Sequence, residues 1–277
     1  MRILIDITHP AHVHFFKNAI WQWQRRGDRV IITSREKDIT IRLLGNLGFS
    51  HLVLSRVGRG MGGLCRELFS RCSRLLSVVR RERPDVMLGI GATFIGPVGR
   101  LTGIPVIMFT DTENATVANA LAFRCATRVV TPRCYHGEVP ESKHVQYAGY
   151  HELAYLHPRY FTPDPTVLDR LGVMPGEKFA IMRFVGWGAA HDVGHRGLSL
   201  EMKRKAVREF SRYARVFITS ESPLPETLEQ YRIQISPESI HHALAYASLL
   251  YGESATMASE CAVLGTPAIY LDNEGRG

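Results

Sequence analysis

The sequence predicts an α/β fold with two Rossmann-like, doubly wound parallel-sheet domains that face a cleft. Short β-rich runs alternate with helical patterns in both halves, and this alternation weakens once, between 145 and 177. A chain of 277 residues is also long enough to bury two separate cores. We therefore expect an N-terminal domain over 1–150, a linker over 151–177 and a C-terminal domain over 178–277.

The first domain is predicted from six β-rich runs separated by helical patterns. Strand followed by helix and strand at this spacing indicates right-handed crossovers and a parallel sheet. The strands are expected at 2–7, 29–34, 51–55, 85–91, 105–111 and 128–132, and the helices at 10–26, 38–47, 63–83, 94–101 and 116–126.

The second domain repeats this alternation. Strands are expected at 179–185, 215–220, 249–254 and 267–272, with a short one near 231–236, and helices at 199–213, 237–247 and 255–264. The last strand is followed at once by "NEGRG", although a parallel strand needs cover on both faces. We therefore expect this domain to be truncated.

The cysteine spacing and the lack of long apolar runs narrow the class of protein to which this chain can belong. The five cysteines form no CxxC pair, which favours reduced thiols over disulfides or a zinc site. No run of 18 apolar residues could span a bilayer, and the first residues, "MRILIDIT", lack the apolar core and cleavage site of a signal peptide. These features predict a cytoplasmic protein.

The net charge of +8 is concentrated in one segment, since 56–83 holds eight Arg and two Glu. Apolar residues recur at helical spacing over 63–83, while Arg66, Arg71, Arg74 and Arg81 are expected largely on other faces. The simplest interpretation is a packed helix with a solvated basic face. Peripheral contact with anionic lipid at the inner face of the membrane is the alternative. No nucleic-acid-binding motif is present, so we expect no nucleic-acid partner.

The strongest motif is "YGESATMASECAVLGTPAI", over 251–269. Ser254 is placed to cap a helix beginning at Ala255, and small residues with Thr256 leave the first backbone amides open to an anion. Glu260 lies about 9 Å further along the helix, at a distance suited to ribose hydroxyls. A capped amphipathic helix with a surface glutamate is the simpler interpretation.

Other candidate donor-binding residues also follow predicted strands of the second domain. Arginine can neutralise a diphosphate, tryptophan can stack on a base, and histidine can contact either group. Each residue also has a plain structural interpretation, as a strand end, a loop plug or a helix start. The candidates are Arg183, Trp187, His191, Ser220, Glu221 and His241.

In the first domain, the candidate catalytic residues are His12, Glu113 and Asp111. "THPAHVH" places His12 and His14 about 200° apart on a helix, so they cannot share a metal. His12 is the candidate for substrate contact or proton transfer, with His9 as second choice and His14 as packing. One of Asp111 and Glu113, in "TDTEN", could deprotonate an acceptor hydroxyl, and Glu113 is the preferred base; the simpler interpretation is loop capping.

The chain lacks the phosphate-binding loop of P-loop NTPases and the glycine fingerprint of dinucleotide-binding proteins. Instead, Ser254, Glu260 and "GTPAI" resemble the nucleotide-sugar signature of GT-B glycosyltransferases, as in the lipid-II N-acetylglucosaminyltransferase and the UDP-N-acetylglucosamine 2-epimerases. The whole chain resembles the GT-B-like domain of unknown function 354. The motifs that carry this resemblance are "IDITHPAHVHFFKN", "TSREKD", "FTDTEN", "GYHELAYLHP", "RFVGWGAAHDVGHRGLS" and "FITSE".

The resemblance implies a GT-B-like fold and a nucleotide-sugar substrate. We expect a metal-independent enzyme without a cofactor, which transfers a sugar from a UDP-type donor to a sugar or lipid-linked acceptor in surface polysaccharide or glycolipid synthesis. The C-terminal domain would hold the donor, and the first domain would supply the acceptor site and the base. Two alternatives stay open: a sugar-nucleotide 2-epimerase, and a non-catalytic nucleotide-sugar-binding scaffold at the membrane.

Overall fold

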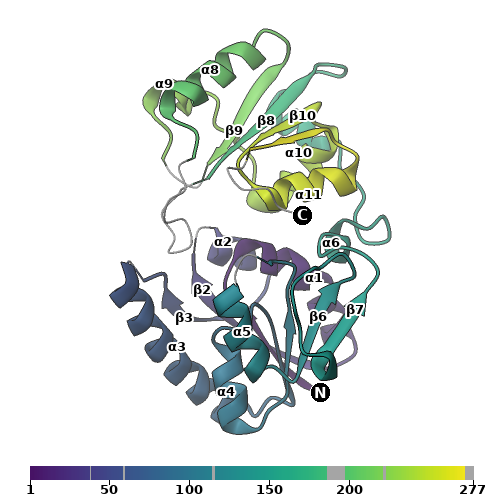
Figure 1. Cartoon of the computed structure of the whole chain (residues 1–277). Helices are drawn as coiled ribbons and strands as arrows, with labels where there is room; N and C mark the ends of the chain where they lie inside the picture. The colour runs from purple at the N-terminus through teal and green to yellow at the C-terminus, as the bar shows by residue number, and fades with distance from the viewer. Residues whose placement is uncertain (38, 59, 114–115, 186–196, 221–222, 272–277) are drawn as a thin grey trace. The chain divides into compact units, whose positions relative to one another are not determined.

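The computed structural model describes residues 1–37, 39–58, 60–113, 116–185, 197–220 and 223–271 (Figure 1). The chain divides into two compact units, Met1–Tyr155 and Leu156–Gly277. Each unit has its own parallel sheet, as the sequence predicts.

The sheet of the first unit has seven parallel strands in the order β3-β2-β1-β4-β5-β6-β7. The chain builds outward from β1 in one direction and then returns to build outward in the other. The order therefore reverses between β1 and β4. The strands are β1 (Arg2–Ile7), β2 (Arg29–Glu36), β3 (Leu52–Arg56), β4 (Val86–Ile90), β5 (Val106–Phe109), β6 (Arg128–Pro132) and β7 (His144–Tyr147).

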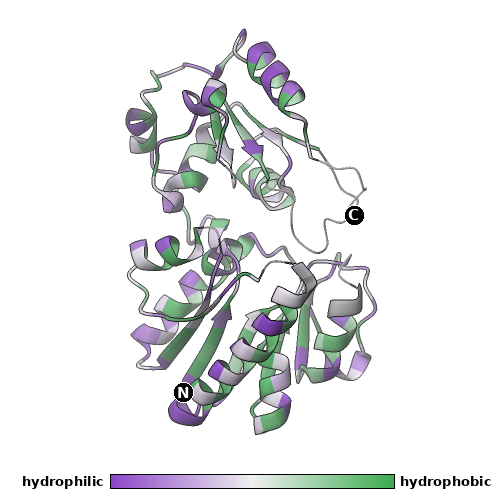
Figure 2. Ribbon diagram, turned by 90° about the vertical axis from the view of Figure 1, so that its left-hand side faces the viewer, coloured by the Kyte–Doolittle hydropathy of each residue, from purple (hydrophilic) through white to green (hydrophobic). Residues whose placement is uncertain are grey.

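Helices cover both faces of this sheet. Buried residues of α1 (Pro10–Arg25) and α2 (Thr40–Asn46) pack with Ile3, Ile5 and Ile7 of β1 on one face. The other face is covered by α3 (Gly60–Glu82), α4 (Ile95–Thr102) and α5 (Thr116–Cys125), with a 3-10 turn η1 (Glu141–Lys143) before β7. Figure 2 shows the apolar strands between helices whose outer sides are hydrophilic.

The second unit has four parallel strands in the order β11-β10-β8-β9. They are β8 (Phe179–Phe184), β9 (Arg215–Ser220), β10 (Leu249–Gly252) and β11 (Ala268–Tyr270), so the order reverses between β8 and β10. One face packs on α7 (Thr166–Leu171), α10 (Ile240–Tyr246) and α11 (Ala255–Leu264), and the other on α8 (Leu200–Phe210) and α9 (Glu226–Glu229). A 3-10 turn η2 (Pro237–Ser239) precedes α10.

The segment expected to be a linker, 151–177, contains α7 and a short helix α6 (Leu153–Leu156). Val167, Leu171 and Val173 are buried in the hydrophobic core of the second unit. Much of this segment is therefore part of the second unit's packing.

Several short elements differ from the predicted secondary structure, among them the four-residue helix α9, which was not expected. The four-residue strand β7 was not expected, and it pairs with β6 at the edge of the first sheet. The short strand expected near 231–236 is reduced to an isolated bridge between Ile218 and Arg232. The chain forms only this one residue pair with β9.

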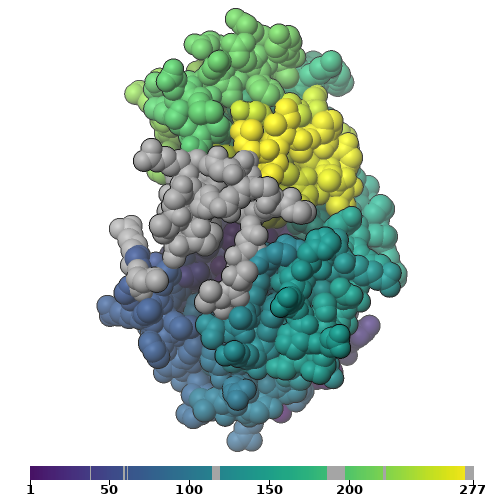
Figure 3. Space-filling model, viewed as in Figure 1, coloured from purple at the N-terminus to yellow at the C-terminus, as the bar shows by residue number. Residues whose placement is uncertain are grey.

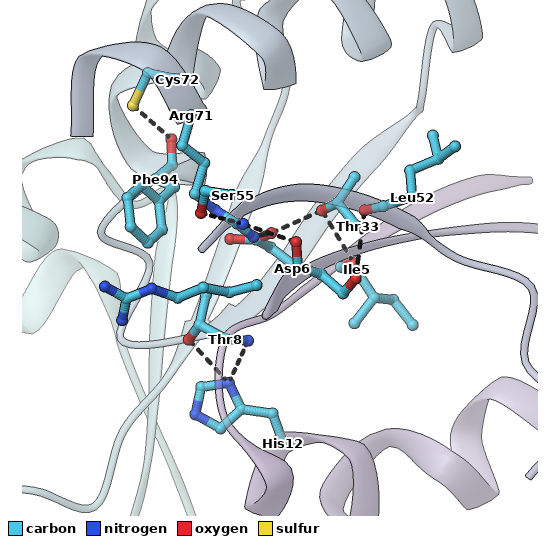
Figure 4. Close-up of polar contacts among 12 residues, drawn as sticks. Ile5, Asp6, Thr8, His12, Thr33, Leu52, Ser55, Arg71, Cys72 and Phe94 are labelled. Carbon is cyan, nitrogen blue, oxygen red and sulfur yellow. Dashed lines mark hydrogen bonds and ion pairs between the residues drawn. The ribbon is translucent and has the colours of Figure 1, made fainter. Parts of the chain in front are cut away.

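The prediction that Arg71 lies on a solvated face is wrong. Its side chain is fully buried, and its guanidinium donates to the carboxylate of Asp6 and, at 2.8 Å, to the carbonyl oxygen of Ser34 (Figure 4). The ring of Phe94 lies 4.7 Å from the guanidinium carbon. The buried carboxylate on β1 gives this arginine a partner that compensates for its lost hydration.

Candidate functional site

Both sheets place polar side chains where the strand order reverses. In open parallel sheets this switch point leaves a crevice at the carboxyl ends of the strands, which is where ligands bind. In the second unit the two strands are β8, which ends with Arg183 and Phe184, and β10, which ends at Gly252. Arg183 and Gly252 are direct partners in the sheet.

The two strands approach so closely that residue 252 has no room for a side chain. A Cβ on Gly252 would lie 2.1 Å from the carbonyl oxygen of Arg183. The Arg183 side chain is half-buried and donates to the hydroxyl of Thr219 at 3.1 Å. The glycine therefore keeps the start of α11 beside the end of β8.

The predicted helix cap at Ser254 is confirmed. The Ser254 hydroxyl accepts a hydrogen bond from the backbone N–H of Met257 at 3.3 Å, and α11 begins at Ala255. Ser254 and Thr256 are half-buried, in the first turn or next to it. The open amides and the dipole of this ten-residue helix favour an anion at its N-terminus.

The structure brings two predicted donor residues, His241 and Glu260, into direct contact. Nε2 of His241 lies 2.9 Å from Oε1 of Glu260, and both side chains are buried. Glu260 is therefore not the surface residue of the simpler interpretation. Its carboxylate lies inside the helix layer formed by α10 and α11.

Glu253 is a buried residue that sequence analysis missed. Its carboxylate accepts hydrogen bonds from the backbone N–H groups of Val185, at 3.2 Å, and Leu198, at 2.6 Å. The ammonium of Lys203 lies 3.9 Å away. Glu253 thus fixes the end of β8 and the approach to α8 next to the N-terminus of α11. Its position between a strand end and a helix cap is the signal that could have found it.

The remaining predicted donor residues are Ser220, Trp187, His191 and Glu221. Ser220 ends β9 and is half-buried. Trp187, His191 and Glu221 lie outside the residues that the structure describes.

The switch point of the first unit lies between β1 and β4. Asp6 and Thr8 from the end of β1 line a small pocket together with 89–90 and 92–95 from the end of β4 and the turn after it. Gly91 and Ala92 both have positive φ, of 78° and 39°, and this conformation is unfavourable for alanine. The β4 turn therefore holds a tight backbone conformation beside Thr8.

His12 lies on the first turn of α1, close to this pocket (Figure 4). Its Nδ1 accepts from the backbone N–H of Thr8 at 3.4 Å, so in the neutral ring Nε2 carries the proton. Burial, together with the charges of His151 and Lys37, lowers the pKa of His12 to about 3. This geometry makes His12 a neutral hydrogen-bond donor and a poor proton acceptor.

The other histidines of "THPAHVH" have structural roles. His9 is the N-cap of α1, and its Nδ1 accepts from the N–H of Ala11 at 3.2 Å. His14 is buried, with its ring 5.5 Å from that of Tyr155. Among the described residues, no group of three His, Cys, Asp or Glu side chains could hold a metal ion.

Asp111 follows β5 and contacts a residue that sequence analysis did not single out, His151. Nδ1 of His151 lies 2.8 Å from Oδ2 of Asp111, while the Asp111 side chain is 40% exposed. Burial raises the pKa of Asp111, but the hydrogen bond and charge of His151 and the hydroxyl of Thr112 outweigh it, so the pKa is lowered. Asp111 is therefore an ionised, partly exposed acceptor.

Glu113 has a different environment from Asp111. Its Oε1 accepts from the backbone N–H of His136 at 3.3 Å. This contact ties the loop after β5 to the loop after β6. Asp111 is hydrogen-bonded to a histidine, whereas the charge of Glu113 acts on Tyr135 and helps to raise its pKa.

The fold is that of GT-B-type enzymes. UDP-GlcNAc 2-epimerase from Neisseria meningitidis superposes with a TM-score of 0.73 at 12% identity, over 99% of this chain and 83% of that one. A spinosyn rhamnosyltransferase superposes with a TM-score of 0.62 at 14% identity, over 98% and 80% of the two chains. The predicted GT-B-like fold class is confirmed.

Sequence relatives extend over different parts of the chain. An uncharacterized protein of Methanocaldococcus jannaschii is 22% identical over 276 residues, covering 96% of this chain and 80% of that protein. The UDP-N-acetylglucosamine–N-acetylmuramyl-(pentapeptide) pyrophosphoryl-undecaprenol N-acetylglucosamine transferase of Tolumonas auensis is 39% identical over 77 residues, or 24% of this chain and 22% of that enzyme. The match to the transferases is therefore local.

One family profile spans nearly the whole sequence. It matches residues 1–273 and is described as "Protein of unknown function (DUF354)". This agrees with the whole-chain resemblance seen in the sequence motifs. The chain belongs to the DUF354 family.

Proposed function

We propose that this protein is a glycosyltransferase that uses a UDP-type sugar donor. The observation that carries the proposal is the N-terminus of α11, capped by Ser254 and located at the switch point of the second sheet beside Arg183. The diphosphate of the donor binds at the open amides of this helix. The helix dipole and the Arg183 guanidinium then offset the charge that develops on the leaving nucleotide.

The first unit binds the acceptor in this proposal. Its switch point offers a neutral N–H donor, His12, and the loop after β5 offers an ionised acceptor, Asp111. A sugar hydroxyl needs both kinds of partner, because it donates and accepts hydrogen bonds. Asp111 is the better candidate for the base, since Nε2 of His12 already carries a proton and Glu113 is engaged by a backbone amide.

The acceptor in this proposal is a lipid-linked sugar at the inner face of the membrane, within surface polysaccharide or glycolipid synthesis. No helix in the described residues has the length and apolar character needed to cross a bilayer. Helix α3 instead supports peripheral contact, because Phe69 is 77% exposed on it between Arg66 and Arg74. This helix runs along the outside of the first unit (Figures 1 and 3).

The proposal is tested by incubating the protein with a panel of UDP-sugars and other nucleotide sugars. We expect a UDP-sugar to raise the melting temperature, because a ligand that binds only the native state stabilises it. Nucleotide release that requires a sugar acceptor supports transfer. A changed sugar without nucleotide release supports the 2-epimerase alternative, and binding without turnover supports the scaffold. If no nucleotide sugar shifts the melting temperature, the proposal fails.

Membrane contact has its own test. The protein is mixed with vesicles that contain anionic phosphatidylglycerol, and with neutral phosphatidylcholine vesicles as the control. We expect sedimentation with the anionic vesicles only, weakened by salt and by Phe69→Ser. Equal behaviour with both vesicle types would contradict electrostatic attachment.

A further inference from the structure

His151 lies in the loop after β7, at the carboxyl edge of the first sheet, and is 7% exposed. The ring of Phe15 meets it edge-on, with centroids 4.7 Å apart. The ring of Tyr147 lies nearly parallel to it, at 10° and 6.3 Å. These two rings fix the plane of the imidazole.

The two nitrogens of His151 have different surroundings. Nδ1 faces the Asp111 carboxylate at 2.8 Å, and since an ionised carboxylate only accepts hydrogen bonds, Nδ1 carries the proton. Nε2 is buried and has no hydrogen-bond partner in the described part of the chain. Because Nε2 is buried, Nδ1 is the nitrogen through which His151 makes its hydrogen bond.

A buried nitrogen without a partner has lost its hydrogen bond to water and gained none in the protein, which destabilises the folded state. A phenylalanine in the same aromatic setting would avoid this cost. The interaction that compensates for it is the bond to Asp111, whose side chain is 40% exposed and thus has oxygen lone pairs open to a ligand. The buried histidine therefore bonds one oxygen of the carboxylate, while the carboxylate stays partly exposed to a ligand.

We propose that His151 is a positioning residue for Asp111, and that its Nδ1–H holds the carboxylate in the orientation that accepts a hydrogen bond from an acceptor hydroxyl. The inference rests on the proposed function for the identity of that hydroxyl, which belongs to a sugar or another polyol. The bond between the two side chains is independent of it. His151 touches no substrate itself.

Several other titratable groups contribute to the electrostatic field at Asp111. His12 on α1 interacts with both Asp111 and His151, and Tyr147 and Tyr135 interact with Asp111. His12 stays neutral near pH 7 because its pKa is lowered to about 3. Burial raises the pKa values of both tyrosines, helped by the charge of Asp111 at Tyr147 and by those of Glu113 and Asp111 at Tyr135, so they too are neutral. His151 is thus the neighbour whose substitution should change the pKa of Asp111 most.

The test compares His151→Asn with His151→Gln. Asparagine places an amide nitrogen where Nδ1 lies, whereas glutamine places its amide near Nε2. The carboxyl carbon of Asp111 is titrated by ¹³C NMR in each protein, with Asp111→Asn to assign the signal and the exposed His157→Gln as control. We expect the Asp111 pKa to stay low in His151→Asn and in the control, and to rise in His151→Gln.

Kinetics provide the second measurement. With a UDP-sugar and an acceptor, His151→Gln should raise the acceptor KM about tenfold or more, the effect of a lost charge-assisted hydrogen bond, and leave the donor Kd unchanged. His151→Asn should restore the KM. An unchanged Asp111 pKa in both variants, or equal loss of turnover in both, would overturn the proposal. Failure of the wild-type protein to bind any nucleotide sugar would overturn the proposed function, while the NMR result would still decide the role of His151.

Discussion

The guanidinium of Arg71, on α3, donates to the carboxylate of Asp6, on β1, with both side chains closed off from solvent. The hydroxyl of Thr33 donates to the same Asp6 oxygen at 2.7 Å, and Ser55 accepts from Arg71 at 3.1 Å. The network joins β1, β2, β3 and α3 next to Thr8, which in turn contacts His12 on the first turn of α1 (Figure 4).

Removing one partner of this pair should be costly. Arg71→Met leaves the Asp6 charge buried without its counterion, and we expect a loss of about 3–5 kcal/mol in the free energy of unfolding, measured with urea. The double variant Asp6→Leu with Arg71→Met should lose less than the sum of the single changes. Arg81→Ala is the control: Arg81 is exposed and paired with Glu82, so it should cost under about 1 kcal/mol. Equal losses of stability in Arg71→Met and Arg81→Ala would contradict a stabilising role for the buried Arg71–Asp6 pair.

Gly252 should tolerate no side chain. Gly252→Ala places a Cβ against the Arg183 carbonyl, and we expect a loss of about 2 kcal/mol or more, since strand β10 must move away from β8. UDP-sugar affinity should fall with it. Gly45→Ala is the matched control, because Gly45 lies in α2 with open space around it and alanine is the better helix former. That variant should gain up to about 1 kcal/mol; thermal unfolding compares the two.

Ser254 should have separable effects on stability and binding. Ser254→Ala removes the cap of α11 and should cost about 1 kcal/mol, whereas Ser254→Gly should cost only a few tenths. Both remove the hydroxyl next to the expected diphosphate and should weaken UDP binding by about tenfold, measured by calorimetry. Ser199→Ala, which removes the cap of α8, should reduce stability alone. If Ser254→Gly binds UDP like the wild type, the hydroxyl does not contact the nucleotide.

His12 should make the protein less stable in mild acid. The pKa of His12 is about 3 in the folded chain and about 6.5 when unfolded, so between these values the unfolded state binds the extra proton. The stabilisation is complete above about pH 6.5 and is lost as the pH falls. Between about pH 7 and pH 5, His12→Asn should lose about 1–2 kcal/mol less than the wild type, measured by urea unfolding. If the free energy of unfolding falls by the same amount in the two proteins between these pH values, the low pKa of His12 is contradicted.

Periodicity and turn residues were sufficient to predict most of the fold. The strand over 128–132 matches β6 at both ends, and Ser254 marks the first residue before α11. These features depend on neighbours along the chain. β7 was missed because a four-residue edge strand carries almost no pattern of its own.

The errors at the candidate site involve partners that are distant in the sequence. Arg71 lies in the apolar stripe of its helix, but its charge argued for solvent, since nothing local indicated Asp6, 65 residues earlier. Glu260 and His241 meet from two different helices. His151 was overlooked because the strand before it, β7, was not recognised, so the histidine was not placed at the carboxyl edge of the sheet.

Each sheet reverses its strand order at one place, and both reversals bring their polar side chains to the carboxyl ends of the strands. The turns that enter the strands, such as Gly27 before β2 and Gly103 before β5, lie at the opposite edge of the first sheet. A fluorophore or affinity tag inserted at these turns would report on the protein without entering its chemistry. The fold thus separates the positions suited to engineering from those reserved for ligands.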